Sequence, residues 1–142
     1  MRAPFRVRYP NEIAAGLVCN ELMANVDLAP TLLDYAVLEA PSSMQGISLR
    51  QTLAGGLGVR SEIYFRYWMH RAHRKDNPAH FGIRTIDFKL IFYYGLPLDA
   101  SGASAERTPP GWELYDLRRD PLELHNVYCD PAYASINVEL KE

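Results

Sequence analysis

The chain has 142 residues, a length that suits one domain or one piece of a larger one. Hydrophobic residues make up 48% of it and charged residues 23%, which excludes a disordered polar chain. The formal net charge of −2 gives no reason to expect a nucleic-acid or anionic-membrane partner. No apolar run approaches the roughly 18 residues of a membrane span. The first residues lack the pattern of a secretory signal.

The first part of the chain is expected to contain a strand and two helices. Phe5–Tyr9 alternates in polarity, which predicts a short strand. Asp27 is placed to cap a helix over residues 28–36. Ser48 is placed to cap a short helix that ends at Gly55-Gly56. Helical spacing puts three apolar residues on one face of the first helix: Leu28, Leu32 and Tyr35.

The second part is expected to form an antiparallel sheet. Residues 62–69 are rich in aromatic residues and predict a strand. Residues 81–85 and 88–94 predict a hairpin, and the second of these strands is apolar on both faces, which is typical of a central strand. A long loop follows. The last predicted elements are a strand over 112–117, a type I turn at Asp120-Pro121, and a helix that Asp130 caps and that runs towards Leu140.

Five segments carry motifs that occur together, in this order, in one enzyme family. The first is residues 1–10. The second, Asn25–Ala36, is close to "D-x-x-P-T-x-L-x-x-A", and the third, Met44–Leu49, is similar to "G-x-S-L". The fourth, Ile83–Ile91, is similar to "R-T-x-x-Y-K-L-I", and the fifth, Glu113–Val127, is similar to "E-L-Y-D-L-x-x-D-P-x-E-x-x-N". Together they resemble the C-terminal part of type I sulfatases, the alkaline-phosphatase-like sulfuric ester hydrolases. The motifs cover nearly the whole chain.

The resemblance implies an α+β fold: a small antiparallel sheet of three to four strands with a packed C-terminal helix, preceded by the last strand and helix of a sulfatase-type α/β domain. We expect residues 1–58 to be the end of the α/β domain and residues 59–142 to be the C-terminal subdomain. One departure concerns Val37, which stands where many relatives carry glycine after the helix. A β-branched residue is unfavourable in a left-handed helix cap.

The resemblance also implies a catalytic apparatus that this chain lacks. Type I sulfatases use a formylglycine made from Cys or Ser in a C/S-x-P-S/A-R motif, and a divalent cation, usually calcium, bound by oxygen ligands. Cys129-Asp130-Pro131 begins in the same way, but Tyr133 replaces the arginine, and Cys19 lies in no such motif. We therefore expect no catalytic residue in this chain. Whether the two cysteines pair is open.

Two groups of acidic or histidine residues have spacings that a metal site could use, but neither is expected to bind a metal. Asp27 and Asp34 are seven residues apart on a helix, where the first is interpreted as a cap and the second as part of a solvated face. His70 and His73, with His80, have spacing that a zinc site tolerates, but a fourth ligand is missing. No metal and no cofactor is therefore expected in this chain itself.

Substrate contact is the functional role that the resemblance leaves for these residues. In relatives this part of the sheet leans over the active-site cleft, so His80, His70, His73 and Arg84 could reach a sulfated sugar. The alternative is that they are surface loop residues. Lys89 is expected to neutralise an acidic neighbour such as Asp116 across the sheet, and His125 is expected to be a turn residue.

Three functional hypotheses follow. The first is that the chain is the C-terminal part of a sulfatase, which shapes the substrate cleft and is inactive alone. Its partners would then be the remainder of the catalytic domain or a second copy, and a sulfated carbohydrate. Neither a nucleic acid nor a membrane is expected as a partner. The second is a stand-alone binding module without enzymatic activity. The third is the C-terminal part of a related phosphonate or phosphate monoester hydrolase. The compartment is not predicted.

Overall fold

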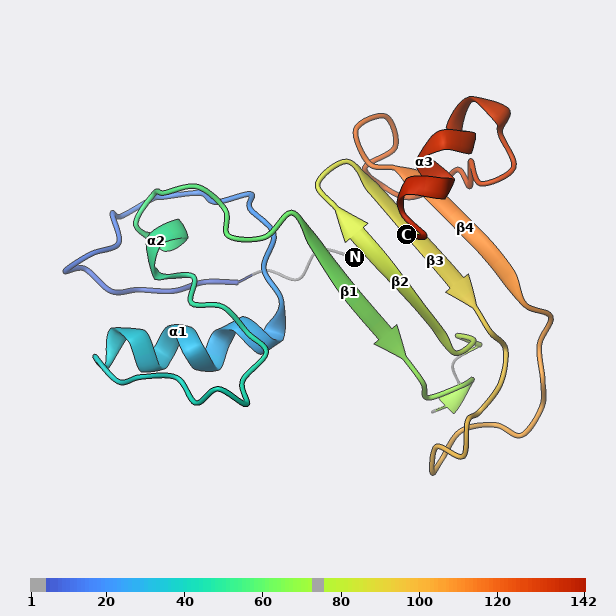
Figure 1. The fold of residues 1–142 in the computed structure, drawn as a ribbon, viewed down its shortest axis with the longest axis horizontal. Coiled ribbons are helices and arrows are strands. Elements are labelled where there is room, and N and C mark those ends of the chain that lie inside the picture. Colours follow the sequence, from blue (N-terminus) through green and yellow to red (C-terminus); the bar gives the residue numbers. More distant parts are fainter. Residues whose placement is uncertain (1–4, 73–75) are drawn as a thin grey trace. The chain divides into compact units, whose positions relative to one another are not determined.

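The computed structural model describes residues 5–72 and 76–142, and the chain divides into two compact units, residues 1–61 and 62–142 (Figure 1). The first unit contains a 3-10 helix, η1 (Asn25–Asp27), and two α-helices, α1 (Leu28–Tyr35) and α2 (Arg50–Leu53), joined by long loops. None of the helices in the described ranges is long and apolar enough to cross a membrane.

The predicted strand at the start of the chain is wrong. Residues 5–9 have no regular secondary structure. A strand is defined by its hydrogen bonds to a neighbouring strand, and the described part of the first unit contains no strand with which this segment could pair. An alternating sequence is therefore not sufficient to form a strand here.

Asp27 does not cap α1 as predicted, because its backbone is already helical and its side chain makes no cap bond to that helix. Instead it is completely buried. Its carboxylate accepts the amide hydrogens of Ala24 (2.8 Å) and Ile47 (2.9 Å). The Arg60 guanidinium donates to both oxygens, at 2.8 and 2.5 Å. Burial alone would raise the pKa of Asp27, but Arg60 and the two backbone donors outweigh it and hold the pKa below its ordinary value.

The inward face of α1 is also different from the predicted one. Leu32 is 69% exposed, whereas Pro30 and Thr31 are buried. The Thr31 hydroxyl donates to the Asp27 carbonyl (2.5 Å) and accepts the amide hydrogen of Leu49 (2.9 Å). The helix is thus attached to the following loop by hydrogen bonds more than by an apolar face, which is why apolar spacing was misleading.

Two of the sequence motifs, Asn25–Ala36 and Met44–Leu49, contact each other in this unit. Gly46 lies so close to the Asn25–Ala36 segment that a Cβ at this position would be 1.9 Å from the Val26 carbonyl oxygen. Ser48, two residues later, donates to the carboxylate of Asp34 (2.5 Å). Arg50 donates to the same carboxylate (2.9 Å). The Asp34 side chain is half-exposed, so it reaches solvent in part. It differs from the expected solvated face in that its carboxylate is bonded to Ser48 and Arg50.

Both helices of the first unit end with a left-handed residue. After α2, Gly55 has φ +92°, and the next amide, that of Gly56, donates to the Gln51 carbonyl (2.9 Å), as predicted for this glycine pair. After α1, Val37 takes the same role with φ +58°, and the amide of Leu38 donates to the Leu33 carbonyl (2.9 Å). The unfavourable left-handed cap at Val37 is thus present in the structure.

Replacing Val37 with glycine is expected to stabilise the first unit by about 1 kcal/mol. A left-handed conformation costs a residue with a Cβ roughly 1–2 kcal/mol, part of which the greater freedom of glycine in the unfolded chain cancels. The Val37 side chain is 86% exposed, so little packing is lost. Urea denaturation measures the change. Ala36→Gly is the matched control, since Ala36 has φ −81°, and it should destabilise; a Val37→Gly variant that is equally or less stable contradicts the prediction.

The second unit is an antiparallel sheet of four strands in the order β1-β2-β3-β4 (Figure 1). The strands are β1 (Glu62–Tyr67), β2 (His80–Thr85), β3 (Phe88–Tyr93) and β4 (Gly111–Asp116), followed by a 3-10 helix, η3 (Pro131–Tyr133), and α3 (Ala134–Glu139). The predicted α+β fold, the hairpin and the central position of the strand after it are confirmed. Asp130 caps the last helical segment by accepting the amide hydrogen of Ala132 (2.9 Å), as predicted.

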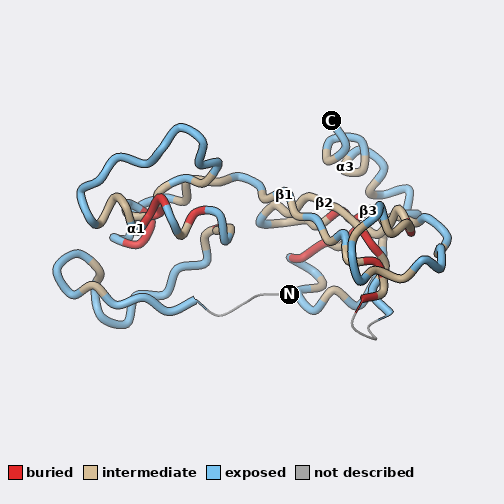
Figure 2. Tube along the Cα trace, turned by 90° about the horizontal axis from the view of Figure 1, so that it is seen from below, coloured by how far each residue is buried: buried red, intermediate tan, exposed pale blue. Residues whose placement is uncertain are grey.

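The two faces of the sheet differ in what covers them. On one face the C-terminal segment packs against the strands: Tyr128 stacks on Trp112 with ring centroids 5.7 Å apart, and Tyr133 contacts the Phe88 ring. The burial along the chain is shown in Figure 2, where the most buried residues of this unit lie on and beside the strands. The other face carries Arg84, Lys89 and Glu113, and we call it the charged face.

Candidate functional site

The charged face is built from three cross-strand rows. Each row contains one residue from each of the four strands, paired across the sheet. Because side chains alternate along a strand, every second residue belongs to this face. The rows are Ile63, Arg84, Lys89 and Tyr115; Phe65, Gly82, Ile91 and Glu113; and Tyr67, His80, Tyr93 and Gly111.

Arg84 and Lys89 are direct cross-strand partners, and one carboxylate lies between them and pairs with both. Glu123, in the loop after β4, forms an ion pair with Lys89 and accepts a longer bond from Arg84 (3.4 Å). All three side chains are less than a fifth exposed. Burial raises the pKa of Glu123, but Lys89 outweighs it, so the pKa lies below its ordinary value.

Lys89 thus pairs with an acidic residue as predicted, but that residue is Glu123 and not Asp116. The register explains the difference: Asp116 is opposite Phe88, so it points to the other face of the sheet from Lys89. On that face Asp116 accepts a hydrogen bond from the Tyr133 hydroxyl (3.1 Å).

A second carboxylate, Glu113, lies in the next row between two tyrosines. The hydroxyls of Tyr93 and Tyr115 both donate to its Oε2 atom, each at 2.9 Å. Burial, reinforced by the bond to Glu113, raises the pKa of Tyr93, and the same two causes raise the pKa of Tyr115 to about 12. Both hydroxyls therefore remain hydrogen-bond donors throughout the neutral range.

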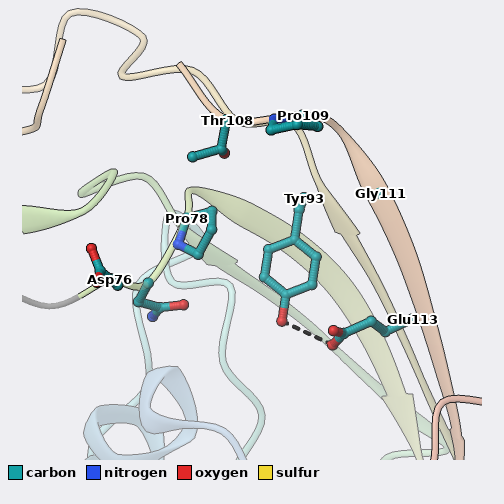
Figure 3. A pocket seen from close by; sticks show the side chains of 8 residues that line it. Asp76, Pro78, Tyr93, Thr108, Pro109, Gly111 and Glu113 are labelled. Atoms are coloured by element: carbon teal, nitrogen blue, oxygen red, sulfur yellow. Dashed lines mark hydrogen bonds between the residues drawn. The ribbon is translucent and has the colours of Figure 1, made fainter. Parts of the chain in front are cut away.

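An open pocket of about 370 Å³ lies at the end of the sheet where β3 ends and β4 begins (Figure 3). In Figure 3 the Tyr93 ring lies between Pro78 and the start of β4, and its hydroxyl points to Glu113. The lining comes from the segment before β2, from β3, and from the segment that enters β4. The lining residues are Asp76, Asn77, Pro78, Tyr93, Thr108, Pro109, Gly111 and Glu113.

His70 connects the two segments that form the walls of this pocket. It is completely buried. Its Nδ1 accepts the amide hydrogen of Ala79 (3.0 Å), so the proton is on Nε2, which donates to the Glu106 carbonyl (2.7 Å). Both ring nitrogens are thus bonded within the unit. This arrangement favours a structural role for His70, in place of the predicted substrate contact.

His80 lies beside the pocket, half-buried among aromatic rings. It stacks on Tyr67 with centroids 5.5 Å apart and contacts the Tyr93 ring at 5.1 Å. Its Nδ1 is bonded to the Pro78 carbonyl (2.8 Å), so Nε2 is the nitrogen left for a ligand. His80 thus contacts a residue that lines the pocket without lining it itself, while Arg84 belongs to the Glu123 cluster and His73 lies outside the described residues.

The remaining candidates are not among the residues that line the pocket. Cys19 and Cys129 are both exposed and unpaired. His125 is an exposed loop residue whose amide donates to Asp120 (2.7 Å). Within residues 5–72 and 76–142, no group of three His, Cys, Asp or Glu side chains could hold a metal ion. Sequence reasoning did not single out Tyr93, Glu113 or Glu123 as a group; strand alternation was the signal that places the first two on one face.

Comparison with known proteins identifies the family of this chain. The family model described as "N-sulphoglucosamine sulphohydrolase, C-terminal" matches residues 1–142. The chain belongs to this family. It is therefore a sulfatase C-terminal domain, as the motifs indicated.

The similarity extends to individual sulfatases. An N-acetylglucosamine-6-O-sulfatase of Bacteroides thetaiotaomicron is 37% identical over 99% of this chain. A solved structure of BT4656 in complex with its substrate, D-glucosamine-2-N,6-O-disulfate, is 38% identical and superposes with a TM-score of 0.79 over 94% of this chain. The phosphonate monoester hydrolase of Agrobacterium radiobacter has the same fold over 80% of the chain, with a TM-score of 0.53 and 24% identity.

The chain spans only part of these proteins. It covers 24% of the length of the Bacteroides sulfatase, 25% of the BT4656 chain and 22% of the hydrolase chain. The relatives thus extend beyond the segment that this chain matches, and as sulfatases they imply a divalent cation and a formylglycine in the full-length enzyme. The described residues of this sulfatase domain offer no cluster that fits the cation.

Proposed function

We propose that this chain forms the C-terminal wall of the substrate cleft in a sulfatase that hydrolyses sulfate esters of a carbohydrate. The observation that carries the proposal is the match to carbohydrate sulfatases along the whole chain, together with the site around His80 on the charged face. The nucleophile and the cation would come from the rest of the enzyme. Residues 1–58 would complete its α/β domain, and residues 59–142 would form the subdomain beside the cleft.

The role of His80 follows from its geometry. Its ring is held by Tyr67 and by the Pro78 carbonyl, so its orientation is fixed before a ligand arrives. A fixed imidazole can donate to or accept from a sugar hydroxyl with little loss of conformational entropy. We therefore assign His80 to substrate binding, while Arg84, which already pairs with Glu123, would act mainly by holding the sheet.

A chimera tests the proposal. The segment of the Bacteroides N-acetylglucosamine-6-O-sulfatase that matches this chain is replaced by the chain, and sulfate release from glucosamine 6-sulfate is measured with calcium. We expect turnover by the chimera, and none by the isolated chain or by the relative lacking the segment. His80→Ala in the chimera should raise KM about tenfold, the effect of losing about 1.4 kcal/mol of binding, with kcat little changed.

The matched control is His125→Ala, because His125 is exposed and lies outside the site. It should leave KM unchanged. A soluble, folded chimera that hydrolyses an aryl phosphonate but no sulfate ester would favour the related phosphonate hydrolases. Turnover by the isolated chain, or a His80→Ala variant that behaves like the control, would contradict the assignment.

A further inference from the structure

The pocket beside Tyr93 has a chemistry that differs from that expected for a sulfate site. Among the residues that the structure describes, its lining contains two carboxylates, Asp76 and Glu113, and no cationic side chain. Asp76 is paired with Arg71 (2.9 Å) at the rim, where it is 89% exposed. A sulfate or carboxylate ligand has no donors to offer to carboxylates and is repelled by them. The pocket is therefore suited to a ligand that brings hydrogen-bond donors.

The Tyr93 ring supplies the apolar part of the same pocket. A pyranose has one face of C–H groups, which can lie on an aromatic ring, and a rim of hydroxyl groups, which donate to carboxylates. Glu113 has an acceptor available for such a donor: both tyrosines bond to its Oε2, and its Oε1 makes no hydrogen bond within the described residues. The volume of about 370 Å³ lies in the range of small-ligand pockets.

The walls of the pocket are already fixed. The His70 ring bonds to Ala79 on one side and to Glu106 on the other. Arg71 adds an ion pair to Glu106 (2.5 Å) besides its pair with Asp76. A ligand would therefore find the site preformed and would pay little conformational entropy to order it.

We infer that this pocket binds an unsulfated pyranose, either neutral or carrying an amino group, through the Tyr93 ring and the Glu113 carboxylate. The inference rests on the proposed function in one respect, because a polysaccharide substrate would supply such a unit next to the sulfated one. It adds to that function a subsite that binds the unsulfated sugar unit next to the sulfated one through its hydroxyl or ammonium donors.

Binding to the full 142-residue chain tests the inference directly. The probes are D-glucosamine, N-acetylglucosamine and glucuronate at equal ionic strength, followed by the amide NMR signals of Tyr93, Gly111 and Glu113. We expect saturable shifts with both amino sugars and at least about tenfold weaker binding of glucuronate, because the Glu113 carboxylate repels it. No saturable shift with either amino sugar, or equal binding of glucuronate, overturns the inference.

Variants locate the site. Glu113→Gln keeps the shape of the side chain and should weaken glucosamine binding about five- to tenfold through loss of the charge-assisted bond. Tyr93→Leu should weaken it at least about tenfold, whereas Tyr93→Phe, which keeps the ring, should stay within about threefold. The matched controls, Tyr64→Leu and Glu62→Gln, change the exposed side chains of β1 on the other face and should have no effect. Equal binding by wild type and Glu113→Gln counts against the site.

The two proposals fail separately. If the chimera hydrolyses glucosamine 6-sulfate but the chain binds neither amino sugar, the subsite is wrong and the proposed function stands. If the chain binds glucosamine as expected and a soluble chimera releases no sulfate, the proposed function is wrong and the subsite stands.

Discussion

Replacing Asp27 with asparagine is expected to destabilise the first unit by about 3–5 kcal/mol, the range for breaking a buried ion pair by removal of one partner. Asp27 is completely buried and accepts from Arg60 and from two backbone amides. Asparagine would leave the Arg60 guanidinium without its counter-charge and would place its own NH₂ group opposite another donor. The loss combines an uncompensated charge with unsatisfied amide groups.

Amide hydrogen exchange is the suitable measurement, because both tryptophans of the chain, Trp68 and Trp112, belong to the second unit and do not report on the first. The amides of Ile47 and Leu49, which bond to Asp27 and to Thr31, should lose their protection in the variant. Asp34→Asn is the control: Asp34 also pairs with an arginine, Arg50 of α2, but it is 41% exposed, so its loss should cost less than about 1 kcal/mol. Equal effects of the two substitutions would refute the argument.

Acidification should act on the same residue. The pKa of Asp27 is lower in the folded chain than in the unfolded chain, so its contribution to stability is complete above the unfolded value of about 4 and is lost as the pH falls through the folded value. Stability of the first unit should therefore decrease below about pH 4. The Asp27→Asn variant should lack this component of the acid dependence.

The sheet could be predicted from the sequence because its signals are local. Aromatic and β-branched residues mark the strands, and the turn at residues 86–87 fixes how β2 and β3 pair. The helix cap at Asp130 is local in the same way. These elements were predicted correctly since each of them is specified within a few neighbouring residues.

The charged contacts could not be predicted, because their partners are far apart in the chain. Asp27 has the local appearance of a helix cap, yet its partner Arg60 lies 33 residues later, and no helical period connects them. Glu123 is 34 residues from Lys89. The strand register decides which acidic residue faces Lys89, and the register follows from the packed sheet.

Replacing Glu123 with alanine is expected to destabilise the second unit by about 2–4 kcal/mol. The change leaves Arg84 and Lys89 side by side on neighbouring strands, with side chains only 17% and 15% exposed. Two like charges that face each other across a sheet repel, and partial burial reduces the screening by water. Urea denaturation followed by tryptophan fluorescence measures the effect, since both tryptophans lie in this unit.

A second substitution separates charge repulsion from loss of packing. Lys89→Met in the Glu123→Ala background removes the repelling charge while keeping an apolar side chain of similar length, so it should recover about half of the lost stability or more. The control is Asp87→Ala, which breaks the ion pair with Arg118 across 3.7 Å; both of those side chains are about half-exposed, so the cost should stay below about 1 kcal/mol. If Lys89→Met gives no recovery, the stability lost with Glu123 comes from its packing, and the neutralisation of Arg84 and Lys89 is not what holds this face of the sheet.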